Sequence, residues 1–160
     1  MTALEHVPVR VVVGIQAASA ADALRQLGDV LVGAGDVDPE YVVDVLRREA
    51  TFPTGLPTDP PVALPHADPN HVRRSAVAVG VCRSPVTFRE MGNPMRELDV
   101  RVIFLLAIRE KTEVTAVLRD LVTALRDHDR LIRLQEAATP AQARRVLAEM
   151  LRATTVNTGG

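Results

Sequence analysis

Apolar residues gather in three short runs of strand length, separated by segments with a different spacing. The runs are VRVVVGI (9–15), SAVAVGV (75–81) and DVRVIFLLAI (99–108). A continuous apolar run of this length, rich in β-branched residues, is typical of a strand that is buried on both faces. The third run is the most apolar, so we expect it near the centre of a sheet, with a shorter strand at 62–64.

Between and after these runs, apolar residues recur every three or four positions, as on the buried face of a helix. Ser19 is a favourable N-cap for the first of these patterns, and Thr139, Pro140 and Gln142 form a capping box that opens the last. The expected helices run from Ser19 to Gly33, from Pro39 to Glu49, from Val114 to Leu125, around Leu131 and Leu134, and from Thr139 to Leu151.

Proline and glycine predict loops in two segments. TFPTGLPTDPP (51–61) holds four prolines and one glycine, and PVTFREMGNPMREL (85–98) contains the turn signal GNP. The order of strands and helices then predicts one domain over residues 1–160, of the α/β (α+β) class, with a mixed central β-sheet and helices on both faces. We expect residues 1–8 and 153–160 to fray.

Composition and charge narrow the classes of function. The net charge is −1, the arginines are scattered and aromatic residues make up 2%, so the basic stripe or stacking platform of a nucleic-acid binder is missing. No apolar run reaches the ~18 residues of a membrane-spanning helix, and the N-terminus shows no secretory signal. A single Cys82 excludes an internal disulfide and fits a reducing cytosol. We therefore expect a cytoplasmic protein without membrane insertion.

His66, within the stretch PVALPHADPNH (61–71), is the first candidate for chemistry. It is a turn histidine bonded to the backbone, a ligand, or a reactive centre, and residue type alone favours the turn histidine. His66 and His71 lack the i, i+4 spacing of a helical zinc pair, and Asp68 still leaves the set without a fourth ligand, so we expect no metal. The motifs of serine hydrolases and of nucleotide-binding loops are also missing.

The order of several short motifs resembles one known family. A predicted helix ends in RRE (47–49), PTGL (53–56) and VALPHAD (62–68) follow, and PVTFREMGNP (85–94) precedes VIFLLA (102–107). This arrangement resembles the fructose/mannitol-type (type 2) IIA domain of the bacterial sugar phosphotransferase system over nearly the whole chain. FPTGL, PHADPNHVRRSA and PVTFREMGNP are most similar to the galactitol-specific branch of that family.

The resemblance implies roles for individual residues. His66, in the apolar-P-H motif, would be the phosphoryl acceptor, carried as a tele-phosphohistidine. Arg48, in the R-E motif, would lie near it and stabilise charge on the phosphate. Asp68 and His71 fall in the galactitol-like motif as candidate binding residues, His71 with no established role. Mannitol-type members carry a second histidine where the leucine pattern places Val114, so this chain departs from the mannitol pattern there.

The chemistry of these residues is consistent with that role. A neutral imidazole is a good nucleophile near pH 7, since its unperturbed pKa is ~6.5. Phosphoryl transfer needs mainly positioning and charge stabilisation. A proline-flanked loop, the guanidinium of Arg48 and backbone amides of the PHAD turn can supply these without a metal or cofactor.

Three hypotheses for function follow from the resemblance. In the first, His66 accepts a phosphoryl group from HPr and passes it to a cognate IIB domain, which serves a membrane IIC permease for galactitol, fructose or mannitol. In the second, the chain is a regulatory relative of the nitrogen-control type. The third is a degenerate binding domain without phosphorylation, against which the presence of both Arg48 and His66 argues. PHADPNHVRRS favours the first, and the sequence names no single sugar because a carrier contacts other proteins only.

Overall fold

The computed structural model describes residues 3–158 and shows twelve elements of secondary structure there. In chain order they are η1 (Ala3–His6), β1 (Val9–Ile15), α1 (Ala20–Gly33), α2 (Pro39–Thr51), β2 (Gly55–Leu56), β3 (Val62–Ala63), η2 (Pro69–His71), β4 (Ala76–Glu90), β5 (Asn93–Ala107), α3 (Lys111–Ala124), α4 (His128–Gln135) and α5 (Pro140–Thr158).

The five strands form one mixed sheet. β1 lies parallel to β4, β4 lies antiparallel to β5, and β5 lies parallel to β3, which pairs antiparallel with β2. β5 therefore has a partner on each side, which confirms the central position expected for the run 99–108. The two-residue strand β2 lies inside the proline-rich segment 51–61, where the sequence predicted only a loop.

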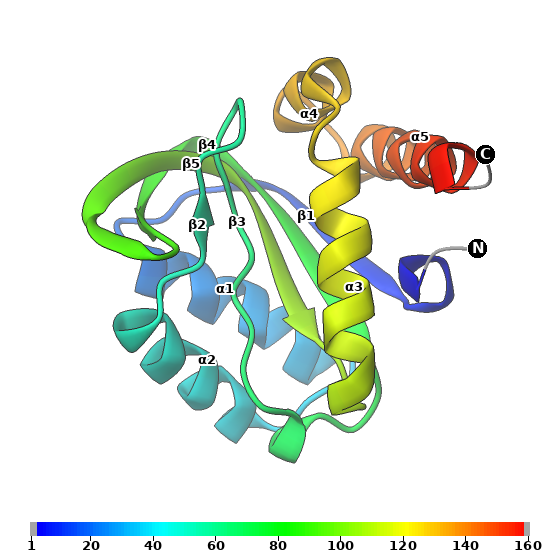
Figure 1. Ribbon diagram of the computed structural model, residues 1–160. Coiled ribbons are helices and arrows are strands. Elements are labelled where there is room, and N and C mark those ends of the chain that lie inside the picture. Colours follow the sequence, from blue (N-terminus) through cyan, green and yellow to red (C-terminus); the bar gives the residue numbers. More distant parts are fainter. Residues whose placement is uncertain (1–2, 159–160) are drawn as a thin grey trace.

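The side chains of the central strand β5 point alternately to the two faces of the sheet, and so they contribute to two hydrophobic layers. Val102, Phe104 and Leu106 pack on the layer that includes α3, α4 and α5, whereas the intervening residues pack on the layer that includes α1 and α2. Figure 1 shows α1 and α2 on one side of the sheet and α3 on the other. A buried side chain of this size stabilises the fold by about 1.5–3 kcal/mol. The predicted single domain, with a mixed sheet and helices on both faces, is confirmed.

The segment 85–98 is not the loop that the sequence predicted. β4 and β5 continue through it as one long antiparallel hairpin, which turns at Gly92 with φ of +78°. Val86 and Phe88 are buried, while Pro85, Thr87 and Arg89 are exposed. That alternation is the period of a half-buried strand, and the turn signal at Gly92 marks only the tip. In Figure 1 the hairpin curls away from α3, α4 and α5.

The prolines of this hairpin caused the wrong prediction. Pro85 lies within the interval 81–86 where the β4–β5 register shifts. Such irregularities are where a strand tolerates a residue without an N–H. The sequence prediction treated these prolines as ends of regular structure, whereas the flanking alternation carries the strand past them.

Both ends of the chain are more regular than expected. Ala3–His6 forms a short 3₁₀ helix with Leu4 buried, and α5 continues to Thr158, beyond the predicted end at Leu151. The expected fraying at residues 1–2 and 159–160 lies outside the described residues. The predicted cap at Thr139 is present, since its hydroxyl accepts the N–H of Gln142 at 3.2 Å.

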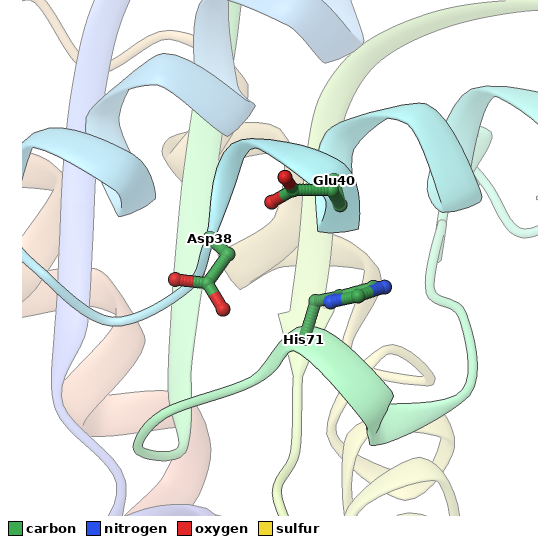
Figure 2. Close-up of side chains that lie close together, drawn as sticks. All are labelled: Asp38, Glu40 and His71. Carbon is green, nitrogen blue, oxygen red and sulfur yellow. The ribbon is translucent and has the colours of Figure 1, made fainter.

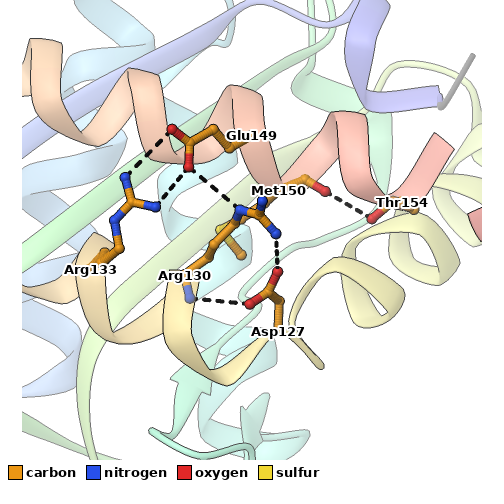
Figure 3. A network of polar contacts seen from close by, with 6 residues as sticks. All are labelled: Asp127, Arg130, Arg133, Glu149, Met150 and Thr154. Atoms are coloured by element: carbon orange, nitrogen blue, oxygen red, sulfur yellow. Dashed lines mark hydrogen bonds and ion pairs between the residues drawn. The ribbon is translucent and has the colours of Figure 1, made fainter. Parts of the chain in front are cut away.

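Ion pairs fix α4 against α5 (Figure 3). Arg133 and Arg130 both donate to the carboxylate of Glu149, at 2.8 and 3.5 Å, and Arg130 also pairs with Asp127, whose side chain caps α4. Hydrogen bonds and charge from the two arginines lower the pKa of Glu149. This network lies in the layer of α3–α5 and serves the packing of that layer.

A buried carboxylate anchors the turn that leads into α2. Asp36 is fully buried and accepts two hydrogen bonds from Arg10 on β1 and one from Arg74, at 2.8–3.0 Å. Burial alone would raise its pKa, but the hydrogen bonds from both arginines lower it below its usual value. The N–H of Asp38 then donates to the carbonyl of His71 at 2.9 Å. The start of α2 is thus fixed against the segment that follows the PHAD turn.

Gly55 provides a direct test of this fold. A Cβ at Gly55 would lie 2.6 Å from the backbone oxygen of Arg89, and a backbone atom paired in a sheet has little room to move. We expect Gly55→Ala to lower the free energy of unfolding by about 1–3 kcal/mol, the usual cost of overpacking. Urea denaturation measures it. Gly33→Ala is the control, since nothing lies within 4 Å of its Cβ position, and an unchanged midpoint for Gly55→Ala would contradict the close approach.

Candidate functional site

The backbone around His66 is attached to the central strand. His66 forms an isolated parallel bridge with Leu106 of β5, and the N–H of Leu106 donates to the carbonyl of Pro65 at 2.9 Å. Pro65 is buried, and its ring fixes φ just before the histidine. The sheet therefore extends up to His66, and the proline-flanked loop begins only after it.

The ring of His66 is oriented by one hydrogen bond. Its Nδ1 lies 2.8 Å from the carbonyl oxygen of Leu64. A carbonyl oxygen only accepts, so Nδ1 carries the hydrogen and the lone pair of the neutral ring is on Nε2. Part of the ring is buried. The geometry thus leaves Nε2 as the nucleophilic atom.

The surroundings of His66 favour the neutral ring. Burial lowers its pKa, the hydrogen bond to Leu64 raises it, the positive charge of Arg48 lowers it and the negative charge of Asp68 raises it. The net pKa lies below the ordinary value for histidine. Because the neutral form is the nucleophile, this shift keeps more of the ring reactive at neutral pH.

Arg48 lies in the last turn of α2, near the histidine. Among the described residues its buried Nε has no hydrogen-bond partner, and no carboxylate forms an ion pair with its guanidinium. The guanidinium lies 5.6 Å from the centre of the Phe52 ring. Arg48, Ala67 and Asp68 line a surface cavity of about 340 Å³. The positive charge of Arg48 acts on His66, although His66 itself does not line this cavity. An arginine that lines a cavity without an ion-pair partner is available to an anion.

Glu49, next to Arg48, attaches the end of α2 to the strand that carries the site. Its two carboxylate oxygens accept the N–H and the hydroxyl of Thr54, at 2.9 and 2.8 Å. The carbonyl of Thr54 then accepts the N–H of Leu64, the residue that orients His66. Burial raises the pKa of Glu49, against the effect of both hydrogen bonds. The R-E and T-G motifs are therefore joined directly, because Glu49 of the first accepts two hydrogen bonds from Thr54 of the second.

The other two predicted binding residues lie in different places. Asp68 lines the cavity beside Arg48 and its charge acts on His66. His71 is on η2, with its Nε2 3.8 Å from the carboxylate of Asp44, and among the described residues it does not line that cavity. The structure thus brings Asp68, but not His71, to the cavity of Arg48.

One group of side chains in the described part of the chain has the spacing of a metal site. Ligand atoms of Asp38, Glu40 and His71 lie within 4.8 Å of one another (Figure 2). Arg73, however, forms an ion pair with Asp38. The charge of this carboxylate is therefore already balanced by an arginine of the chain, without a metal ion. Of the residues considered from the sequence, His66, His71 and Asp68, the group includes only His71.

Val114, where the leucine pattern places the second histidine of mannitol-type members, lies in the first turn of α3. Its side chain is partly buried and packs against the hydrophobic cluster between the sheet and α3–α5. At this position the chain has an apolar contact, and no imidazole is available from it.

Sequence reasoning assigned no role to Tyr41, Glu49 or Thr54. Glu49 and Thr54 were visible as parts of the quoted motifs. Tyr41 is the one tyrosine of the chain and lies on the same helix as Arg48. Its place in the apolar pattern of that helix gave it the appearance of an ordinary core residue.

No helix among the described residues combines the length and the apolar character needed to cross a membrane. Residues 8–150 match the model of the family described as phosphoenolpyruvate-dependent sugar phosphotransferase system, EIIA 2.

Three known proteins illustrate the similarity. The galactitol-specific EIIA component of Escherichia coli K12 is 24% identical over 117 residues, which are 72% of this chain and 77% of that protein. The transcriptional regulator ManR of Bacillus subtilis is 29% identical over 90 residues, 56% of this chain but 12% of the regulator. Enzyme IIAMTL of Escherichia coli, solved in complex with phosphorylated enzyme IIBMTL, superimposes with a TM-score of 0.75 at 27% identity, covering 88% of this chain and 94% of that one.

The match to the family model spans nearly all of the described residues, and the solved relative shares the fold over most of both chains. The chain belongs to the EIIA type 2 family of the phosphoenolpyruvate-dependent sugar phosphotransferase system, whose members act in phosphoryl transfer.

Proposed function

We propose that the protein is a phosphocarrier in which Nε2 of His66 accepts the phosphoryl group. The observation that carries the proposal is the oriented ring of His66, with Nδ1 bound to Leu64, on which the charge of Arg48 acts while the buried Nε of that arginine has no hydrogen-bond partner. Nε2 forms the new bond to phosphorus as the bond to the donor nitrogen breaks, and the electron pair of that bond stays with the donor. Arg48 meets the charge on the equatorial oxygens.

The partners follow from the family and from its relatives. The donor is the phosphocarrier HPr, and the acceptor is a cognate IIB domain that serves a membrane IIC permease. The solved complex of IIAMTL with phosphorylated IIBMTL supports a IIB partner. The similarity to the galactitol-specific component supports a sugar alcohol or sugar of the galactitol, fructose or mannitol class. Cytoplasmic location accords with such partners.

One amide of the PHAD turn is not available to a phosphate. The N–H of Ala67 donates to the hydroxyl of Tyr41 at 3.2 Å. This donor is therefore engaged inside the fold. The proposal accordingly assigns the larger share of phosphate recognition to Arg48, and Asp68 acts through its charge on the ring of His66.

A second candidate is a regulatory function, in which the phosphorylation state of His66 controls a partner. The similarity to 90 residues of the regulator ManR favours it. Both candidates use the same phosphohistidine, and they differ in what the phosphorylated protein does next. Transfer from phosphorylated protein to a cognate IIB domain supports the carrier, whereas a stable phosphorylated form that changes the activity of a bound partner supports the regulator.

We expect one phosphate on His66 after incubation with phosphoenolpyruvate, enzyme I and HPr. Mass spectrometry of the intact protein and of its peptides locates it, and the adduct should be acid-labile and base-stable, as a phosphoramidate is. His66→Gln should accept none, and His6→Gln, on the exposed end of η1, should accept as much as the wild type. Phosphate on His71 or on a serine would contradict the assignment.

We expect Arg48→Ala to slow phosphoryl transfer by about 10²–10³, the usual cost of losing one preorganised donor. Arg48→Lys should recover only part of the rate, because a point charge does not reproduce a two-pronged contact. Removing Arg48 leaves no carboxylate among the described residues without its ion-pair partner, so circular dichroism should show a folded protein. The control is Arg145→Ala, an exposed arginine on α5. Equal rates for Arg48→Ala and this control would mean that Arg48 is not used.

The lowered pKa of His66 predicts the pH dependence of phosphoryl acceptance. The reactive form is neutral, so the rate should fall as pH drops through the pKa of the ring and should be flat above it. With that pKa below the ordinary ~6.5, the plateau should already be reached at pH 7. Imidazole resonances followed by NMR give the pKa directly, and a midpoint above ~6.5 would refute the effect of burial.

A further inference from the structure

The hydroxyl of Tyr41 lies inside the backbone bridge that holds His66. Tyr41 is 1% exposed, and its hydroxyl donates to the carbonyl of Leu106 at 2.6 Å while it accepts the N–H of Ala67 at 3.2 Å. Leu106 is the bridge partner of His66, and Ala67 is the next residue along the chain.

A parallel bridge of this register has two backbone hydrogen bonds. One is present, from the N–H of Leu106 to the carbonyl of Pro65. The second would join the N–H of Ala67 to the carbonyl of Leu106, and the Tyr41 hydroxyl lies between these two groups. The hydroxyl thus bonds to both groups of this second contact, immediately after the histidine.

This arrangement couples the position of His66 to that of Arg48. Positions 41 and 48 are seven residues apart, about two turns of helix, and therefore lie on the same face of α2. The same rigid element fixes the backbone after His66 through Tyr41 and places the guanidinium beside the ring. Burial raises the pKa of Tyr41, so its hydroxyl keeps its proton and remains able to donate and accept at once.

We propose that Tyr41 is a positioning residue for phosphoryl transfer, whose hydroxyl holds the segment after His66 at a fixed distance from the central strand and from α2. The proposal rests on the proposed function of His66. Without the hydroxyl, the N–H of Ala67 and the carbonyl of Leu106 lose their shared partner, and the segment relaxes. The Nδ1 contact to Leu64 then loosens, and Nε2 is no longer held in one orientation.

Tyr41→Phe removes the hydroxyl and keeps the ring. We expect the transfer rate at saturating phosphorylated HPr to fall by roughly tenfold or more, since small misplacements of reacting groups are costly. The apparent affinity for HPr should change little, because Tyr41 is buried. The matched control is Thr154→Val, which deletes a buried hydroxyl bonded to Met150 on α5 (Figure 3). A rate for Tyr41→Phe equal to that of the control at similar stability would overturn the proposal.

A second readout needs no phosphoryl transfer. Nitrogen chemical shifts of the His66 ring report which nitrogen carries the hydrogen, and Tyr41→Phe should move the resting protein from one tautomer toward a mixture. The control should leave the tautomer unchanged. If the wild type is never phosphorylated, the proposed function fails, while the ring shifts still decide whether Tyr41 orients His66. An unchanged tautomer in Tyr41→Phe would count against it.

Hydrogen exchange in the wild type provides the test should Tyr41→Phe not fold. The Ala67 amide lies in a loop next to an isolated bridge, where a solvent-bonded N–H exchanges fast. Its bond to a buried hydroxyl predicts strong protection instead. Fast exchange of this amide would show that Tyr41 does not hold it.

Discussion

The hydrogen bond from Nδ1 of His66 to the carbonyl of Leu64 determines which nitrogen of the neutral ring keeps its lone pair. A histidine in a loop has two tautomers and several rotamers, and an acceptor at 2.8 Å selects one of each. The acceptor is itself fixed, because Leu64 is buried and its N–H donates to Thr54. In the proposed function, the reactivity of His66 thus depends on backbone geometry, and the side chains around it hold that geometry.

One helix fixes the rest of the site. α2 contributes Tyr41 to the segment after His66, Arg48 to the cavity and Glu49 to the segment before it, through Thr54. Its start is anchored by backbone bonds to the residues around His71. Because these contacts come from one rigid element, loosening any of them changes the relation of nucleophile to guanidinium. A buried guanidinium nitrogen without a hydrogen-bond partner is unfavourable, and under the proposed function a phosphoryl group on His66 would supply that partner.

The sequence predicted the architecture well, because periodicity reports burial. The continuous apolar run along 102–107 and the spacing of the leucines gave the central strand and the helices, and the order of these elements gave helices on both faces of the sheet. The hairpin was missed since the turn residues Pro85 and Gly92 were weighted above the alternation of Val86 and Phe88. The apolar pattern of one strand does not reveal a register shift such as the one between Val81 and Val86, because that shift depends on the pairing with β5.

The candidate site came from motif resemblance more than from pattern. His66 alone was favoured as a turn histidine, and indeed its ring does bond to the backbone; what the sequence could not show is that this bond leaves Nε2 free. The role of Tyr41 was not visible either, because its partners Ala67 and Leu106 lie 26 and 65 residues away. Contacts between distant segments follow from the folded topology, and a single sequence does not encode them in any local signal.

The atom that carries phosphorus is the most direct test of this account. Nuclear magnetic resonance of ¹⁵N-labelled protein, phosphorylated through HPr, assigns the phosphorus–nitrogen coupling to one nitrogen of the His66 ring. With Nδ1 bound to Leu64, the account predicts the coupling at Nε2. Coupling at Nδ1 would mean that the ring turns away from Leu64 before it reacts, and would contradict the claim that this hydrogen bond selects the nucleophile.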